Sequence, residues 1–226
     1  MELAIDTSSE IASVALSDQG RILSELTWCS GQWHTVDLIP TIENLFKQAK
    51  VDKKNISAVF VARGPGSFNG LRVGISAAKA VAFALNIPLV GISTLEIAAF
   101  PFAFTQMLLC PIHGAGRTDI AVSFYRQMAT SWKCLEDAHL TTVDTLCKKI
   151  AEATVFCGEI PDAVIEHLIT KLDEKAIIPP AAVRLRRASS LVLLGLQRME
   201  TGKVDSAATL QPLYLRPPPI TIRKVK

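Results

Sequence analysis

The sequence lacks paired cysteines and clustered histidines. Its five cysteines are odd in number and widely spaced, with no Cys-x-x-Cys pair, so neither a disulfide framework nor a zinc knuckle is indicated. The four histidines are also far apart and offer no two metal ligands one helical turn from each other. We therefore expect free, mostly buried thiols and no metal site.

Charged residues are scarce as well. They make up 20% of the 226 residues, and the formal net charge is only +3. Nucleic-acid-binding proteins usually cluster basic residues among aromatic ones. Only two short basic clusters occur here, Arg184 to Arg187 and Arg223 to Lys226, and we interpret both as solvated surface.

Long uncharged hydrophobic runs and a signal peptide are also missing. Met1-Glu2 leads directly into the strand-like Leu3-Ala4-Ile5, and the longest apolar run, Ala77 to Leu85, is interrupted by Lys79. A helix needs about 20 apolar residues to span a bilayer. We therefore expect a soluble, cytoplasmic protein with no membrane contact.

The sequence does contain an ordered alternation of strand and helix patterns, which occurs twice. The first half predicts strands at 3–6, 11–16 and 22–28, a helix at 35–49, a strand at 56–62, a helix at 71–85, a strand at 88–92 and a helix at 95–99. The second half predicts strands at 107–112, 120–125 and 128–135, a helix at 143–151, a strand at 154–157, a helix at 160–170, a strand at 177–178 and a helix at 188–201.

This order predicts the fold class. A meander followed by alternating helices and strands indicates a mixed sheet covered by helices, as in the ribonuclease H-like lobes of actin-like proteins. We predict an α/β protein with a ribonuclease H-like lobe at residues 1–104 and a smaller, similar lobe at residues 105–226.

A glycine-rich loop, Arg63 to Arg72, joins the strand at 56–62 to the next helix. Such a loop can present backbone amides to an anion at the start of a helix. It lacks the Gly-Lys-Ser/Thr of a Walker A loop and the glycine spacing of a dinucleotide fingerprint. An anion site and a tight turn without a ligand both remain open, and Arg63 and Arg72 could clamp a phosphate or be solvated.

Asp6-Thr7-Ser8 ends the first strand, where an actin-like fold places its first phosphate loop. With Gly64 and Gly66, these residues are the candidates for a nucleotide site. We favour the simpler interpretation that Asp6 and Ser8 cap the turn between two strands. Ser67 lacks the surrounding glycines of a nucleophile elbow, so the sequence predicts no catalytic residue.

These motifs together resemble the TsaB family, also called YeaZ, of bacterial tRNA threonylcarbamoyladenosine biosynthesis. The likeness rests on Ala4 to Ser8, His34 to Pro40, Gly64 to Gly74, Ala78-Lys79, Ile87-Pro88 and Leu213 to Arg216. It is strongest over residues 1–96, and it implies a C-terminal strand near Leu213. Residues 112–117 depart from the Asp-Ala-Arg type segment that is common in the family, which leaves the role of this loop open.

The resemblance implies a subunit without chemistry of its own. The related catalytic subunit, TsaD, carries a metal-binding His-x-x-x-His whose positions fall here on Thr94 and Ala98, and neither side chain binds a transition metal as imidazole does. We therefore expect a non-catalytic partner of TsaD in a heterodimer that the ATPase TsaE joins, with tRNA contacted indirectly.

Several alternatives stay open. The isolated chain could form a homodimer, and although we expect no cofactor of its own, a nucleotide could bind at the partner interface. A small ATP-dependent kinase of the actin-like superfamily would instead bind ATP through Asp6 and the glycine loop. A glycoprotease-like peptidase is the less favoured alternative.

In this family, pairing uses two helices that correspond to about residues 35–50 and 70–85. The second helix is rich in alanine, which allows another helix to approach it closely. We expect the partner interface to include Leu38, Thr41, Ile42, Leu45, Arg72, Ile75, Ser76, Ala77, Lys79 and Ala80.

Overall fold

The first of two sheets is a meander extended by two parallel strands. The computed structural model describes residues 1–116 and 118–216. The sheet contains β1 (Glu2–Asp6), β2 (Ile11–Asp18), β3 (Arg21–Cys29), β4 (Ala58–Ala62) and β5 (Leu89–Ile92), in the order β3-β2-β1-β4-β5. β1 to β3 pair antiparallel, and β4 and β5 continue parallel to β1. These strands confirm the predicted meander and the mixed sheet.

The second sheet repeats this topology. It contains β6 (Leu108–Gly114), β7 (Asp119–Gln127), β8 (Trp132–Thr142), β9 (Thr154–Glu159) and β10 (Ala176–Ile177), in the order β10-β9-β6-β7-β8. Again a meander comes first, and two strands follow parallel to its first member. The third strand starts at Trp132 and not at 128, because a turn closed by the 2.8 Å bond from Met128 N to Ser131 O separates it from β7.

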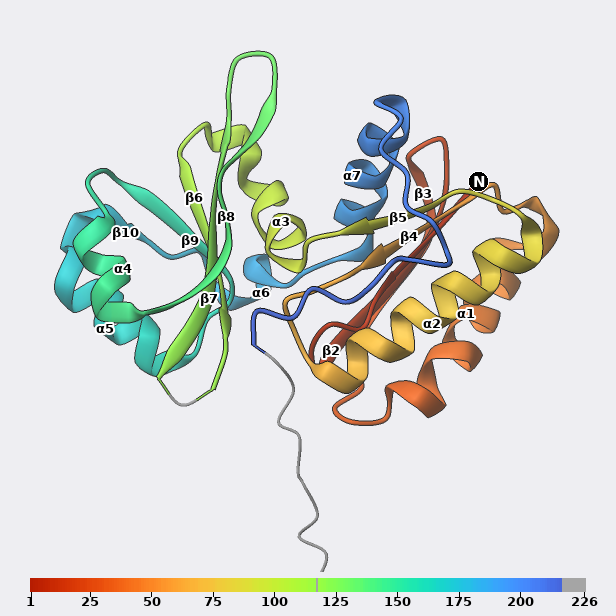
Figure 1. Ribbon diagram of the computed structural model, residues 1–226, viewed down its shortest axis with the longest axis horizontal. Coiled ribbons are helices and arrows are strands. Elements are labelled where there is room, and N and C mark those ends of the chain that lie inside the picture. Colours follow the sequence, from red (N-terminus) through yellow and green to blue (C-terminus); the bar gives the residue numbers. More distant parts are fainter. Residues whose placement is uncertain (117, 217–226) are drawn as a thin grey trace, which may run out of the picture.

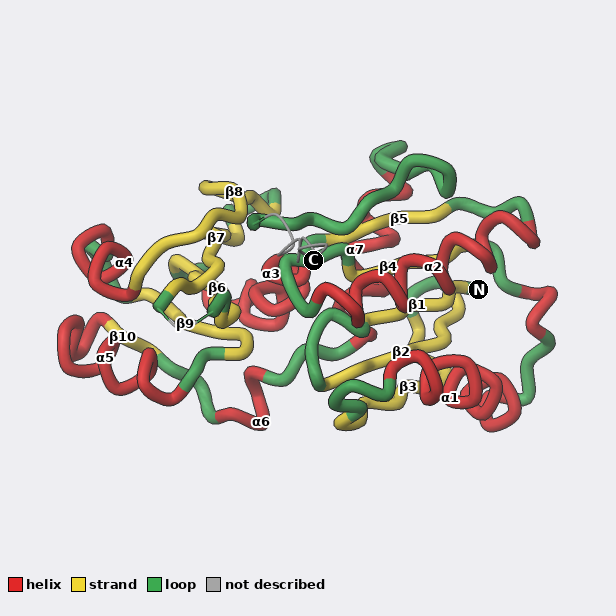
Figure 2. The backbone as a smooth tube through the Cα atoms, turned by 60° about the horizontal axis from the view of Figure 1, so that its bottom comes forward, coloured by secondary structure: helices red, strands yellow, loops and turns green. Residues whose placement is uncertain are grey.

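Two long helices cover one face of the first sheet, α1 (His34–Ala49) and α2 (Phe68–Leu85), and they lie side by side (Figure 2). Each buries one apolar stripe against the strands, as an amphipathic helix does. Each ends at a left-handed residue, Lys50 and Asn86 respectively. By length and composition α2 could cross a membrane, but its inner stripe packs on β4 and β1.

The second sheet is covered on its outer side by α4 (Val143–Lys149) and α5 (Asp162–Leu172) (Figure 1). A short helix, α6 (Ala181–Arg184), then leads back toward the first sheet. Short 3₁₀ helices also occur at Lys53–Asn55, Phe100–Thr105 and Asp173–Lys175.

Two helices each pack on the sheet that the other half of the sequence forms. α3 (Thr94–Ala99) follows the first sheet but packs on β6, β7 and β9 of the second. α7 (Ala188–Glu200) follows the second sheet but packs on β1, β5 and β2 of the first, where Leu191 and Val192 join the buried cluster around Phe60. The assignment of residues 105–226 to one lobe is therefore wrong for α7, because this helix supplies the apolar cover of the first sheet.

The strand expected near Leu213 is absent from the described residues. The segment from Leu213 to Arg216 forms no strand, although Leu213 N donates a hydrogen bond to Arg63 O at 2.6 Å. This bond places the segment beside the glycine loop. The basic cluster Arg223 to Lys226 lies outside the described residues.

Candidate functional site

The corner between β1 and β2 is closed by its own polar side chains. Asp6, Thr7 and Ser8 are all buried. The Asp6 Oδ1 accepts hydrogen bonds from Ser8 N (2.9 Å) and Ser8 Oγ (2.5 Å), and Thr7 Oγ1 donates to Gly70 O (2.7 Å). This is the turn cap that the sequence analysis favoured for Asp6 and Ser8.

A buried arginine fills the same corner. The side chain of Arg186, which precedes α7, is only 3% exposed. Its Nε donates to Asp6 Oδ2 at 3.0 Å, and its Nη2 donates to the Oγ atoms of Ser8 (3.1 Å) and Ser9 (2.9 Å). The interpretation of this basic cluster as solvated surface is therefore wrong for Arg186, whereas Arg187 is exposed.

Glu159 joins this cluster from the second lobe, at the end of β9. Its Oε1 lies 3.0 Å from Arg186 Nη1 and accepts a 2.5 Å hydrogen bond from Ser9 Oγ, and its Oε2 lies 3.4 Å from His113 Nδ1. Burial opposes ionisation of this carboxyl, but His113, Arg186 and Ser9 together lower the pKa of Glu159 to about 2. One guanidinium thus connects a carboxylate of each lobe.

We expect Glu159 to make the free energy of unfolding depend on pH in the acidic range. Its pKa is about 4.5 in the unfolded chain and about 2 in the folded one, so the unfolded state binds more protons between these values. Stability from this group, about 2 to 3 kcal/mol at neutral pH, is therefore present above pH 4.5 and lost as the pH falls toward 2. Urea unfolding across this range should show a shallower pH dependence in Glu159→Gln than in the native protein.

The exposed Glu166 supplies the control for this experiment. Glu166→Gln should keep the pH dependence of the native protein. Equal pH dependence in Glu159→Gln and Glu166→Gln would contradict the role given to Glu159.

The glycine loop packs tightly on the β1–β2 corner. A Cβ atom at Gly66 or Gly70 would overlap the backbone oxygen of Ser8 or Thr7. Ser67 N donates to Ser8 O at 2.7 Å, and Ser67 Oγ accepts from Gly70 N, which caps α2. Of the two interpretations left open by the sequence, this geometry supports the tight turn.

The remaining candidates of the loop are also held by internal contacts. Gly64 N donates to Thr94 Oγ1 at 3.1 Å, and Ala98 is buried. Thr94 therefore supplies a structural hydroxyl and Ala98 a methyl group packed in the core. The Arg72 guanidinium lies 4.6 Å from the centre of the Phe68 ring. Arg63 instead lines a cavity together with Ser93, and Arg72 is not among the residues that line it. The two arginines do not form a clamp around one site.

The segment of residues 113–115, at the end of β6, faces the glycine loop across the lobe junction. His113, Gly114 and Ala115 line a cavity of about 230 Å³ together with Gly66 and Phe68. The ring of Phe68 stacks on Tyr214 at 5.2 Å between centroids. The cavity is mostly apolar, and the described residues that line it include no group of unpaired charges.

The predicted interface residues separate into buried, partly buried and exposed groups. Leu38, Ile42, Leu45 and Ile75 are buried in the core of the first lobe, so their assignment to a surface is wrong, because the apolar stripe of each helix packs on the sheet. Thr41 and Ala77 are partly buried. Lys79 Nζ bonds to Leu210 O at 3.2 Å. Of the predicted set, only Arg72, Ser76 and Ala80 are exposed.

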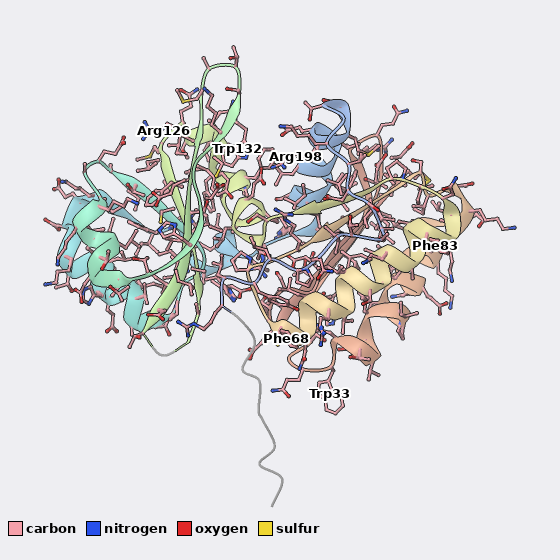
Figure 3. The ribbon with its side chains drawn as sticks, viewed as in Figure 1. Trp33, Phe68, Phe83, Arg126, Trp132 and Arg198 are labelled. Atoms are coloured by element: carbon pink, nitrogen blue, oxygen red, sulfur yellow. The ribbon has the colours of Figure 1, made fainter. Side chains whose placement is uncertain are left out.

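Sequence reasoning missed the apolar residues on the outside of these helices. Trp33, Val36 and Ile39 are 69%, 62% and 53% exposed, and Phe83 is 83% exposed. Figure 3 shows Trp33 beside the start of α1 and Phe83 toward the far end of α2. The spacing of three residues between Trp33, Val36 and Ile39 was the sequence signal that could have identified this face. We call the exposed stripes of both helices the outer helix face: Trp33, Val36, Ile39, Arg72, Ser76, Ala80 and Phe83.

Comparison with known proteins gives the fold and the family. One solved structure, of a Pseudomonas aeruginosa protein described as similar to the peptidase YeaZ, has a TM-score of 0.80 and 23% identity, and the match covers 95% of this chain and 99% of that one. A ROK hexokinase from Thermus thermophilus has a TM-score of 0.53 and 12% identity, over 87% and 99% of the two chains. These two likenesses confirm the actin-like fold.

Relatives in sequence are more informative about the family. A protein of Bacillus subtilis named tRNA threonylcarbamoyladenosine biosynthesis protein TsaB is 29% identical over 217 residues, which cover 95% of this chain and 93% of that protein. The family model described as TsaD, tRNA N6-adenosine threonylcarbamoyltransferase, matches residues 29–223. The chain therefore belongs to the family that this model defines and, by its likeness over nearly its whole length, to the TsaB (YeaZ) branch.

Proposed function

We propose that this chain takes part in forming threonylcarbamoyladenosine in tRNA, as a non-catalytic partner of a TsaD-type transferase. The name of its Bacillus subtilis relative supports the pathway, and the name of the matching family model supports the transferase as partner. The subunit would act in the cytoplasm and contact tRNA indirectly. TsaE would join the same assembly.

One observation carries the non-catalytic role. The corner where an actin-like protein would hold phosphate is filled by Arg186, whose guanidinium binds Asp6, Ser8 and Ser9. A nucleotide at this corner would have to displace a buried cation that is already paired with carboxylates on both lobes. This occupied corner argues against the kinase alternative. The peptidase alternative is disfavoured because, among residues 1–116 and 118–216, no serine or cysteine side chain is hydrogen-bonded to a histidine.

The outer helix face supports the partner role. It exposes Trp33 just before α1, Val36 and Ile39 on α1 and Phe83 on α2, together with the small residues Ser76 and Ala80. Exposed apolar groups of this kind mark interaction surfaces, and small residues let a partner helix come close. The same face would serve a homodimer of the isolated chain, and a nucleotide bound at the edge of the partner interface stays a prediction.

Reconstitution tests the proposal. We expect this chain and its TsaD to elute together in size-exclusion chromatography, and the complete system to form the modified nucleoside only when both are present. We expect the chain alone to transfer neither threonylcarbamoyl nor phosphoryl groups. Transfer by the isolated chain, or undiminished activity of the system without it, would overturn the proposal.

A further inference from the structure

A second cavity lies between the lobes, near α3 and α7. It has a volume of about 410 Å³ and is lined by Arg63, Ser93, Glu96, Tyr125, Asp137 and Arg198, among others. Its first-lobe wall is formed where β4 and β5 end, since Arg63 follows β4 and Ser93 follows β5. The carboxyl ends of neighbouring parallel strands are where open α/β sheets bind ligands. The proposed pairing with TsaD does not use this cavity.

Two of the charged residues in this cavity are paired with each other. Arg198 Nη2 lies 2.9 and 2.7 Å from the two carboxylate oxygens of Glu96, and Trp132 Nε1 donates to Glu96 Oε1 at 3.2 Å. Figure 3 shows Trp132 on the second lobe and Arg198 on the first, near the same end of the junction between them. This group connects the lobes and neutralises itself.

The other polar side chains that line the cavity, those of Arg63, Ser93 and Asp137, are not paired in this way. Arg63 Nε is buried without a hydrogen-bond partner among the described residues, and the same is true of Ser93 Oγ. Ser93 precedes α3, yet its side chain makes no capping hydrogen bond. Across the cavity, the only hydrogen bond to the Asp137 side chain among the described residues comes from the thiol of Cys134, at 3.7 Å. A buried polar group without a partner costs free energy, so Arg63 Nε and Ser93 Oγ require a ligand or ordered water. Asp137 is exposed, so its carboxylate is solvated and open to a ligand that enters the cavity.

The arrangement specifies the chemistry of the ligand. A guanidinium and a hydroxyl on the first lobe suit a carboxylate, because arginine binds carboxylates through two parallel donors. The carboxylate of Asp137 on the second lobe suits an ammonium group. Burial, followed by the charge of Glu96, raises the pKa of Tyr125, so its phenol stays protonated and can donate. We propose that this cavity binds a small zwitterion of the α-amino-acid class, with its carboxylate at Arg63 and Ser93 and its ammonium at Asp137.

Calorimetric titration of the whole chain with α-amino acids of small side chain tests this inference. We expect saturable binding that weakens at least tenfold for the corresponding 2-hydroxy acid, which lacks the ammonium, and for the amino amide, which lacks the carboxylate. Absence of saturable binding by any amino acid up to roughly 10 mM, the weak end of small-ligand affinity, would mean that water alone fills the cavity and would overturn the proposal.

Variants locate the binding site. Asp137→Asn should bind the amino acid and the 2-hydroxy acid equally weakly, and Arg63→Met should lose the preference for the amino acid over the amide. Ser93→Ala, which removes no capping bond, should weaken binding severalfold and serves if Arg63→Met fails to fold. The exposed Arg21 and Asp18 give the matched controls Arg21→Met and Asp18→Asn, which should bind as the native chain does. Unchanged binding in all three cavity variants would place any site elsewhere and refute the assignment.

Discussion

Replacing Arg186 by methionine is expected to lower the free energy of unfolding by about 3 to 5 kcal/mol, the usual loss when one partner of a buried ion pair is removed. The guanidinium is buried and is the only cation within 4 Å of Asp6 among the described residues. Without it, Asp6 would be a buried carboxylate with no paired cation, and Glu159 would keep only His113 and Ser9 as partners. The hydroxyls of Ser8 and Ser9 would also lose a donor.

Urea unfolding of the native protein, Arg186→Met and Arg187→Met measures this effect. Arg187 is adjacent in sequence but exposed, and as the residue before α7 its side chain makes no capping bond. Arg187→Met should therefore stay within about 0.5 kcal/mol of the native protein, as surface substitutions usually do. Similar small losses in both variants would show that the cluster does not hold the lobes together.

Replacing Ala80 by glutamate is expected to weaken the complex with TsaD by roughly tenfold to a hundredfold. Ala80 is exposed at the middle of the outer stripe of α2, where a partner helix would come close. A glutamate there would have to lose its hydration in the interface without a paired cation. Ala77 is a poorer site for this test because it is partly buried against the core, so a charge there would also disturb folding.

The matched control is Ala163→Glu, because Ala163 is exposed on α5 of the second lobe. Calorimetric titration with TsaD should give the native affinity for this variant. Both variants should keep the native unfolding temperature, because each side chain is exposed in the isolated chain. Native affinity in Ala80→Glu would exclude the outer helix face as the site of pairing.

The sequence was sufficient to predict the order of the elements. Short β-branched strands and helices with a wide apolar stripe alternate in the same order in both halves, and the two sheets have the same strand order. The same stripe led to the wrong surface, because apolar spacing along α1 identifies the residues that face the sheet. Leu38, Ile42 and Leu45 are buried for that reason, and the partner face had to be found among residues outside the stripe.

The site itself depends on contacts that are distant in sequence. Arg186 and Asp6 are 180 positions apart, and nothing in the cluster Arg184 to Arg187 distinguishes the buried arginine from its exposed neighbour. The same is true of α7, whose amphipathic pattern predicts a helix but not the sheet that it covers. Pairing of this kind follows from the path of the chain through both lobes.

The exchange of α3 and α7 has a consequence for any attempt to divide the polypeptide. A fragment that ends at residue 104 would expose the Phe60 side of its sheet, because α7 supplies the residues that cover it. The complementary fragment would lose Leu95 and Ala99, which fill the space beside Leu109 and Tyr125. Neither piece carries a complete interior, so we expect the two to regain native structure only when they are produced together.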